Sequence, residues 1–479
     1  MTADNVKALL RPESIAVIGA SQHAHKPGAV LVRSLIEGGF GGRVHPIHPK
    51  ADIINDRQCY ASVGEVPEQV DLAFVVLARE SVRAAVEQCA AAGVRAVAII
   101  SAGFGESDDW GVQEQAAIAE IIERAGMAAI GPNTIGLVTM GGQLRGSFVQ
   151  FKEWHSGPVA LAAQSGVFAG AVAEEEMART NQRLGICTSV SVGNRIRTSE
   201  ADLVEAFGDD PQVEVIGLYL ESFADAEGFL RKATEVKQNK PVVVLKGGRT
   251  AQGSAAAASH TGSLAADDSV VDQLLQQHGI VRARNEEDFL ALLKGFSYGP
   301  RKTGRNVGMV TFSGAFGVLA ADELELAGLE LVPYTEETLD SFRAILPAWQ
   351  RPRNPADLWP AIDLDPKNAL IDGLGAALRD PNTEQVLGIV LAVDNADFDD
   401  MHDAFAKLRA ELPEKPLHLV ITGGLRERWV DALEGLSIPV YPSVSAAVRV
   451  MGATAWYQDV RETVPSAYAA PLEQRKVNK

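Results

Sequence analysis

Cysteine, aromatic side chains and positive charge are all scarce in this chain of 479 residues. The three cysteines (Cys59, Cys89 and Cys187) lie far apart and form no Cys-x-x-Cys pair. This argues against a disulfide framework or a zinc site and fits a reducing compartment. The formal net charge of −18 disfavours nucleic acid and anionic membrane as partners, because both are bound through a basic face.

Long apolar runs are also missing. No run approaches about 20 residues, and the N-terminus "MTADNVKALLRPES" lacks the apolar segment of a signal peptide. We therefore expect a cytoplasmic protein without a membrane span.

Two nucleotide-binding motifs are absent as well. No G-x-x-x-x-G-K-[ST] occurs, and the glycine turn at Gly19-Ala20-Ser21 does not continue into a G-x-G-x-x-G. Tight packing of a strand against a helix would explain that glycine equally well. The next strand ends in His48-Pro49-Lys50 instead of the acidic residue that holds a ribose, which suits phosphate groups better. A phosphate-rich carrier such as coenzyme A is therefore favoured over NAD.

Alternating strands and helices fill the first 150 residues. Short apolar segments such as "SIAVIGAS", "VDLAFVVLA" and "VRAVAII" are separated by segments with helical spacing such as "PGAVLVRSLIEGG". This pattern predicts an α/β fold with a parallel sheet covered on both faces, whose ligands bind at the carboxyl ends of the strands. We expect a Rossmann-like domain over residues 1–150.

An internal repeat follows. The segment "GPVALAAQSGVFAGAVAEEEMAR" parallels "RNVGMVTFSGAFGVLAADELELAG", and two later strands of each copy match in the same order. Two flavodoxin-like parallel-sheet domains are the economical interpretation, over residues 151–300 and 301–462, with a tail at 463–479.

The two copies differ at ionisable positions. The first copy ends one strand with Glu221 and continues from a later strand into "AQGSAAAASHTGSLA", which contains His260. The second copy has Ala392 at the first of these places and "RERWVDALEGLS", without histidine, at the other. We therefore expect the chemistry to lie in residues 151–300.

Several roles are open to His260. No other metal-ligating side chain stands at ligand spacing, so no metal site is expected, and "AQSGVF" lacks the first glycine of a hydrolase G-x-S-x-G elbow. A phosphohistidine needs a carboxylate on its other ring nitrogen, which Glu221 can supply, and a phosphate cradle. The amides of Ser165-Gly166 at a helix start can supply the cradle. A plain surface or core histidine with an ordinary helix cap is the competing interpretation.

These segments resemble a known family. "KGGRTAQGSAAAASHTGSLA", together with "SIAVIGAS", "GFGE" and "GPNTIG", is similar to the alpha subunit of NDP-forming acyl-CoA synthetases, relatives of succinyl-CoA synthetase and ADP-forming acetyl-CoA synthetase. The resemblance covers about residues 7–460. It implies that His260 is transiently phosphorylated, that Glu221 orients it, and that Gln164-Ser165-Gly166 open the helix that holds the phosphoryl group.

The resemblance also implies a reaction and a CoA site. The reaction is carboxylic acid + CoA + ATP = acyl-CoA + ADP + phosphate, through a phosphohistidine and an acyl phosphate. CoA is expected across the loops of the first domain, with phosphates near Pro49 and Lys50. The residues expected to contact CoA are Gly19, Ala20, Ser21, Pro49, Lys50, Ser101, Ala102, Gly103, Phe104 and Asn133.

The chain also departs from the family pattern. The ATP-grasp module of these enzymes is not seen, so we expect ATP or ADP with Mg²⁺ to bind a separate ATP-grasp beta subunit in a hetero-oligomer. After Asn354-Pro355-Ala356-Asp357 comes "LWPAID", a segment expected to shape the pocket for the small carboxylic acid. The alternative function is a CoA or acyl-CoA binding or regulatory protein that has lost its ligase activity.

Overall fold

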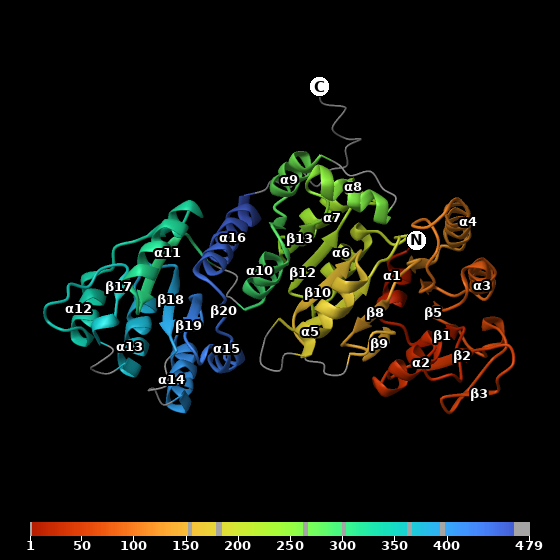
Figure 1. Ribbon diagram of the computed structural model, residues 1–479, viewed down its shortest axis with the longest axis horizontal. Coiled ribbons are helices and arrows are strands. Elements are labelled where there is room, and N and C mark those ends of the chain that lie inside the picture. The colour runs from red at the N-terminus through yellow and green to blue at the C-terminus, as the bar shows by residue number, and fades with distance from the viewer. Residues whose placement is uncertain are drawn as a thin grey trace, which may run out of the picture. The chain divides into compact units, whose positions relative to one another are not determined.

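A computed structural model of the protein describes residues 2–151, 156–178, 184–261, 267–298, 303–361, 366–392 and 398–463. These residues form two compact units, the first reaching Arg282 and the second beginning at Ala283. Three large sheets follow one another along the chain, in red to orange, in yellow to green and in cyan to blue (Figure 1). The α/β class predicted from the sequence is confirmed.

The first sheet is parallel throughout. Its strand order is β2 (Arg43–Ile47), β1 (Ser14–Ile18), β5 (Leu72–Val75), β6 (Ala96–Ile99) and β7 (Ala128–Ile130). The accompanying helices are α1 (Ala3–Leu10), α2 (Pro27–Glu37), α3 (Val82–Ala91) and α4 (Asp109–Ala125). Shorter elements are the hairpin of β3 (Ile53–Ile54) and β4 (Arg57–Gln58) and the 3₁₀ turns η1 (Val63–Glu65) and η2 (Arg79–Ser81).

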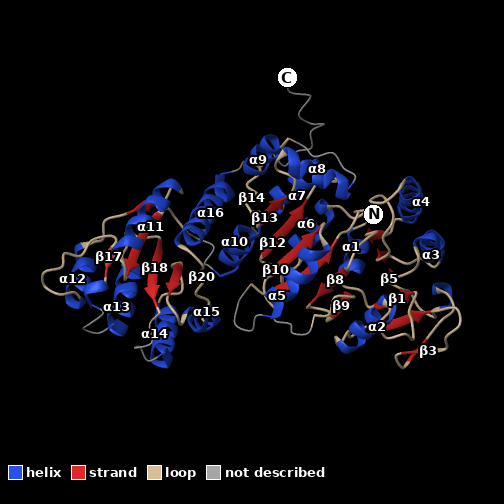
Figure 2. Ribbon diagram, viewed as in Figure 1, coloured by secondary structure: helices blue, strands red, loops and turns tan. Residues whose placement is uncertain are grey.

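Both faces of this sheet are covered, as its apolar strands predict. Side chains alternate between the faces of a strand, and Ile15 and Val17 of β1 pack in a core that includes Leu31 of α2. Ala16 and Ile18 face a separate core that includes Val86 of α3. Figure 2 shows strands in red flanked by blue helices. Such a sheet is open only at its edges, and the carboxyl edge is where the connecting loops are available to a ligand.

The second sheet has a parallel centre and an antiparallel border. Its described strands run in the order β14 (Val281–Ala283), β13 (Val242–Lys246), β12 (Val215–Leu220), β10 (Val159–Ala163), β11 (Ile186–Ser191), β8 (Gly136–Thr139) and β9 (Leu144–Ser147). Strands β10 to β13 pair in parallel, whereas β8 runs antiparallel to both β11 and β9. Its helices are η3 (Phe168–Val172, a π-helix), α5 (Ala173–Ala178), α6 (Glu200–Asp209), α7 (Ala226–Val236), α8 (Ala251–Thr261) and α9 (Asp268–Gln277).

The third sheet lies in the second unit. Its strand order is β16 (Glu330–Leu331), β15 (Asn306–Thr311), β18 (Gln385–Leu391), β19 (Leu417–Thr422) and β20 (Val440–Tyr441), with β17 (Ala356–Asp357) paired to β15. The helices are α10 (Glu286–Tyr298), α11 (Gly314–Leu326), α12 (Glu336–Ile345), α13 (Pro366–Arg379), α14 (Phe398–Glu411), α15 (Arg426–Gly435) and α16 (Val444–Thr463), with the 3₁₀ turn η4 (Trp359–Ala361).

The units and sheets divide the chain at other points than the boundaries predicted near residues 150 and 300. Strands β8 and β9 precede residue 150 but hydrogen-bond into the second sheet. Helix α10 precedes residue 300 but belongs to the second unit, where the Lys294 ammonium contacts the Glu434 carboxylate at 2.5 Å. Sequence spacing does not reveal which sheet a short strand joins. The boundaries near residues 150 and 300 stay predictions.

The parallel parts of the three sheets share one arrangement. β1 lies between β2 and β5, β10 between β11 and β12, and β15 between β16 and β18, so the strand order reverses beside β1, β10 and β15. Ligands of open α/β sheets bind at this switch point, outside the carboxyl ends of the two strands. The fold alone therefore predicts three candidate ligand sites, one at the carboxyl edge of each sheet. Among the described helices, none combines the length and apolar character needed to cross a bilayer.

Candidate functional site

The switch point of the second sheet brings two predicted site residues together. Gln164 directly follows β10 and Glu221 directly follows β12. The Gln164 Oε1 atom accepts hydrogen bonds from the backbone amides of Glu221 and of Ser222, the latter at 3.0 Å. The Gln164 side chain therefore connects the ends of β10 and β12. The sequence analysis predicted Gln164 to be part of the phosphate cradle and did not predict this connection.

The carboxyl group of Glu221 is held in place by its neighbours. Only 8% of Glu221 is exposed, and the Tyr219 hydroxyl donates to its Oε1 atom at 3.2 Å. The Tyr219 ring stacks on Phe168 of η3, with centroids 4.3 Å apart. Burial, followed by the nearby Glu221 carboxylate, raises the pKa of Tyr219 to about 12, so the phenol stays protonated and able to donate.

Lys246 is a buried cation that sequence analysis did not single out. It ends β13, is 3% exposed, and its Nζ atom donates to the backbone oxygens of Glu221, at 2.7 Å, and of Gly247. Burial lowers its pKa. A lysine at the end of the otherwise apolar "VVVLK" was the available signal, because an apolar strand rarely ends in a buried charge without a local partner.

Gly247 lies directly over the carboxyl group. A Cβ at this position would approach the Tyr219 hydroxyl to 3.1 Å and the Glu221 Cγ to 3.4 Å. Glycine at this position therefore avoids a close contact with the Tyr219 hydroxyl and the Glu221 side chain. Helix α8 contains His260 in its last turn, but the His260 side chain lies outside the described residues, as do residues 262–266. The pairing of His260 with Glu221 stays a prediction.

Ser165 and Gly166 precede a helical segment, as predicted. The Ser165 hydroxyl accepts from the Val167 amide at 3.2 Å, and the Ser165 carbonyl oxygen accepts from the Ala169 amide at 3.2 Å. The helix then widens into the π-helix η3 before α5. π-helical turns are rare in proteins as a whole, but those that occur are often found at functional sites. Such a turn changes the direction in which its side chains point. Here the turn contains Phe168, which supports Tyr219.

The predicted CoA residues lie along the carboxyl edge of the first sheet. Gly19 follows β1 with φ of +91°, and a Cβ there would collide with the Val76 carbonyl oxygen, so the turn needs glycine. Ala20 is buried, while the nearly buried Ser21 accepts from the His23 amide at 3.1 Å. Pro49 and Lys50 follow β2 and are exposed, as a phosphate contact requires.

Two further turns of this edge are linked to each other. The Ser101 hydroxyl donates to the Leu77 carbonyl at 2.6 Å, and the Asn133 amide donates to the Ser101 carbonyl at 2.8 Å. Ala102 and Asn133 are exposed, and Gly103 has φ of +93°. The turns after β5, β6 and β7 therefore form one continuous rim.

Phe104 differs from its neighbours on this rim. We predicted that it faces the pantetheine arm of CoA, but its side chain is 0% exposed and packs in the core formed with α3 and α4. Gly103, directly before it, has φ of +93°. Only the Phe104 backbone remains at the rim, with its amide donating to Glu106 at 3.2 Å.

Two family models match the chain. A CoA binding domain matches residues 13–140, and a succinyl-CoA ligase like flavodoxin domain matches residues 156–296. The alpha subunit of ADP-forming acetate–CoA ligase I from Pyrococcus furiosus is 34% identical over 458 residues, which cover 94% of this chain and 97% of that subunit. The chain belongs to the family of ADP-forming acyl-CoA synthetases.

Other members of the ADP-forming acyl-CoA synthetase family are similar over the same length. ADP-forming acetate–CoA ligase II from Archaeoglobus fulgidus is 31% identical over 462 residues, which cover 95% of this chain and 67% of the relative. The chain thus spans about two thirds of that protein. A solved structure titled dinucleotide forming acetyl-coenzyme A synthetase 1 in complex with phosphate and ADP, from Ca. Korarchaeum cryptofilum, gives a TM-score of 0.89 at 29% identity and covers 98% of this chain and 100% of that one. The relatives are named as ADP-forming acetate–CoA ligases, and the resemblance stated from the sequence is confirmed.

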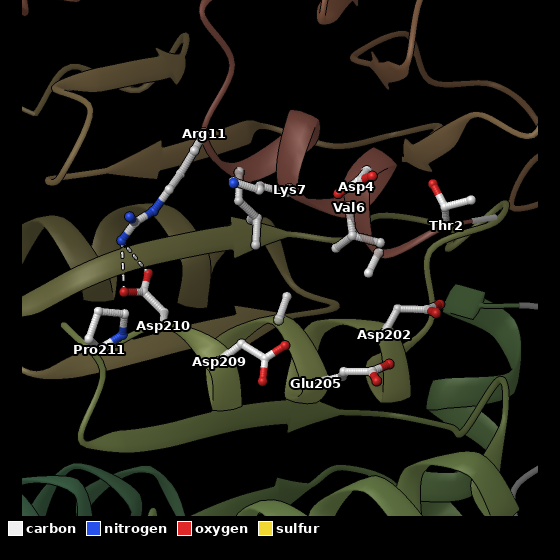
Figure 3. Close-up of a pocket in the computed structure, with 13 residues that line it drawn as sticks. Thr2, Asp4, Val6, Lys7, Arg11, Asp202, Glu205, Asp209, Asp210 and Pro211 are labelled. Atoms are coloured by element: carbon white, nitrogen blue, oxygen red, sulfur yellow. Dashed lines mark hydrogen bonds and ion pairs between the residues drawn. The ribbon is translucent and has the colours of Figure 1, made fainter.

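Each unit also contains a cavity. A cavity of about 460 Å³ between α1 and α6 is lined by Lys7 and Arg11 on one side and by acidic residues of α6 on the other, with Arg11 paired to Asp210 at 2.6 Å (Figure 3). None of the predicted site residues lines it. In the second unit, a cavity of about 410 Å³ at the carboxyl ends of β15, β18 and β19 is lined by Asp357 and by Trp359, and Trp359 belongs to the segment "LWPAID" that was expected to shape the acid pocket.

Proposed function

We propose that the chain is the alpha subunit of an ADP-forming acyl-CoA synthetase, which converts a small carboxylic acid, CoA and ATP into acyl-CoA, ADP and phosphate. The observation that carries this proposal is the buried, hydrogen-bonded Glu221 carboxyl group at the switch point, beneath the glycine loop that leads to His260. An ATP-grasp beta subunit completes the hetero-oligomer and binds the nucleotide with Mg²⁺. The relatives named as alpha subunits support such a partner.

His260 and Glu221 divide the phosphoryl transfer between them. Glu221 accepts a hydrogen bond from Nδ1–H of His260, which leaves Nε2 unprotonated and nucleophilic. Nε2 takes the γ-phosphoryl group as ADP leaves, and the Glu221 carboxylate stabilises the positive charge that develops on the ring. The phosphoryl group then passes to an oxygen of the acid, and the P–N bond breaks as the P–O bond of the acyl phosphate forms.

The helix start at Ser165-Gly166 holds the transferred group. Its free backbone amides carry partial positive charge, so they stabilise a phosphoryl group at the moment of transfer. Gln164 keeps this helix start beside Glu221 through its bonds to the Glu221 and Ser222 amides. The CoA thiolate attacks the acyl carbonyl, and phosphate leaves. CoA binds the rim of the first sheet through Gly19, Ser21, Lys50, Ser101 and Asn133.

Labelling of His260 tests this function. The chain is incubated with labelled phosphate and a panel of acyl-CoAs, and separately with its ATP-grasp partner and γ-labelled ATP. Acid-labile, alkali-stable label on His260 is the expected result. Absence of label in both experiments, across the whole panel, contradicts the mechanism. A complex that binds CoA but never forms ADP-dependent product would favour the alternative, a CoA-binding regulatory protein.

Lys50→Ala should weaken CoA binding by about 1 kcal/mol or more, roughly fivefold in Kd, because a charge-assisted contact to a phosphate is lost. Lys50 is exposed, so the fold should be unaffected. Isothermal titration with CoA measures the change. Lys7→Ala, at the α1 cavity, is the matched control and should bind like the wild type. An unchanged Kd for Lys50→Ala removes Lys50 from the site.

A further inference from the structure

The loop between β11 and α6, residues 192–199, contacts both functional edges of the first unit. Toward the first sheet, the Asn194 amide donates to the Pro132 carbonyl at 2.9 Å and the Ile196 amide donates to the Gly131 carbonyl at 2.9 Å. The Gly131 amide returns a bond to the Val192 carbonyl at 3.0 Å. The turn after β7, part of the proposed CoA rim, is therefore fastened to this loop by main-chain bonds.

The Asn194 side chain extends this attachment to a second turn of the rim. Its Nδ2 atom donates to Glu106 Oε2 at 2.6 Å and to Gln115 Oε1 at 2.8 Å. Glu106 Oε1 in turn accepts from the Gly103 amide at 2.7 Å, and Gln115 accepts from the Gly105 amide at 3.1 Å. Asn194 thus acts through two acceptors that shape the turn after β6.

The charge state of Glu106 suits this arrangement. Burial opposes its ionisation, but the hydrogen bonds from Asn194 and from the Gly103 and Phe104 amides outweigh burial and lower the pKa of Glu106. Glu106 is therefore an ionised acceptor at neutral pH. The Asn194 side-chain amide therefore donates to a charged carboxylate, which makes this hydrogen bond stronger than one between neutral groups.

Arg195, the next residue, points to the other edge. Its Nη1 atom donates to the Ser222 carbonyl at 2.7 Å and to Glu200 Oε2 at 3.0 Å, and its Nη2 atom donates to the Ser222 hydroxyl at 2.6 Å. Glu200 Oε1 accepts from the amides of Ala224 and Asp225, at 2.7 and 3.0 Å. Ser222 follows Glu221 directly, so Arg195 and Glu200 fix the turn on which the catalytic carboxylate depends.

Arg195 is held tightly in this role. Its side chain is 8% exposed, and its backbone adopts φ of +54°, a conformation that non-glycine residues seldom take without a structural reason. The left-handed step at Arg195 lets two successive side chains reach opposite edges. Burial lowers the pKa of Arg195, opposed by its pairing with Glu200, and the guanidinium remains charged.

We propose that Asn194 and Arg195 are positioning residues that hold the CoA rim and the Glu221 turn in register with each other. Asn194 acts on the rim through Glu106 and Gln115, and Arg195 acts on Glu221 through Ser222. The inference rests on the proposed function, because it assigns the two edges to CoA and to phosphoryl transfer. Thioester formation needs the thiol and the acyl phosphate within bonding reach, and displacements of about 1 Å cost on the order of 100-fold in rate.

Two readouts separate these roles from a merely structural one. The complex with the ATP-grasp subunit is tested for CoA affinity by titration calorimetry and for the rate of His260 phosphorylation from γ-labelled ATP. Asn194→Ala should raise the Kd for CoA by roughly tenfold and leave the phosphorylation rate within about twofold of wild type. Arg195→Met should slow phosphorylation by roughly tenfold or more and leave the Kd within about threefold.

Further variants connect each effect to its path. Asn194→Ala combined with Glu106→Gln should lose less binding free energy for CoA than the sum of the losses in the two single variants, because both side chains act on the same turn. Arg195→Lys keeps the positive charge but not the planar set of N–H donors of the guanidinium group. Its phosphorylation rate should therefore lie between those of Arg195→Met and the wild type. Gln276→Ala, which removes an exposed amide bond to Asp272 on α9, is the control and should match wild type in both readouts.

The pattern of results decides the inference. A wild-type complex that does not phosphorylate His260 contradicts the proposed function itself, whatever the variants do. With an active wild type, two results overturn the inference. One is an unchanged Kd for CoA in Asn194→Ala. The other is that each variant weakens CoA binding and slows phosphorylation to the same extent. Where Arg195→Met does not fold, Ser222→Ala removes the hydroxyl acceptor alone and should slow phosphorylation by roughly threefold without changing the Kd.

Discussion

His260→Ala is expected to abolish phosphorylation of the chain, and Glu221→Gln to slow it by about 100-fold while fold and CoA affinity are kept. The glutamine retains an oxygen that can accept from Tyr219, and the bond from the Glu221 amide to Gln164 is independent of the side chain. Only the negative charge is removed, and with it the stabilisation of a charged imidazole ring. Rapid-quench measurement of label transfer from γ-labelled ATP, in the complex with the ATP-grasp subunit, gives the rates.

Glu214→Gln is the matched control for this experiment. Glu214 immediately precedes β12, at the opposite end of the strand that Glu221 follows, and is exposed. Its loss should leave the rate at the wild-type level. A near-wild-type rate for Glu221→Gln would instead make Glu221 an ordinary buried strand-end carboxyl group and leave His260 without its proposed partner.

Lys294→Met should destabilise the second unit by about 3–5 kcal/mol, because removing the cation of a buried ion pair leaves the Glu434 carboxylate without its counter-ion. Glu434 is 0% exposed, Lys294 is its partner at 2.5 Å, and the Lys294 ammonium also donates to the Val440 carbonyl at 3.2 Å. Denaturant-dependent hydrogen exchange of α10 and α15 measures the loss. The exchange of the first unit should stay unchanged, since the pair lies entirely in the second unit.

The second unit also offers a control ion pair. Arg305 and Asp459 are paired at 2.7 Å, but their side chains are 44% and 57% exposed. Because water and salt screen such a pair, Arg305→Met should cost less than about 1 kcal/mol. Equal losses for Lys294→Met and Arg305→Met would show that burial of Glu434 does not determine the cost.

The sequence predicted the strands and the edges on which site residues lie, because both depend on local patterns. Apolar strands ending in glycine or polar residues placed Gly19, Gln164 and Glu221 at carboxyl ends, where the structure has them. The direction of single side chains did not follow from this pattern. Phe104 follows a glycine with positive φ on the rim, yet its ring packs in the core, and the sequence pattern does not distinguish these two directions.

Contacts between segments distant in the chain were beyond sequence reasoning. Arg195 is linked to Ser222 and Asn194 to Glu106, across 27 and 88 residues. Nothing in the local spacing of "SVGNRIRTSE" indicates that these side chains reach opposite edges. The antiparallel addition of β8 to β11 was missed for a similar reason, since a four-residue strand can join either of two neighbouring sheets.

The second copy of the flavodoxin-like fold has closed the position that Glu221 occupies in the first. Ala392 follows β18 as Glu221 follows β12, but it is 1% exposed, packs in the core of its sheet, and donates its amide to the Thr422 carbonyl at 2.7 Å. A glutamate there would be buried without the tyrosine that holds Glu221, because Val390 stands at the place of Tyr219. A buried carboxylate at position 392 would therefore need a new hydrogen-bond partner as well, because a glutamate placed there alone would cost stability.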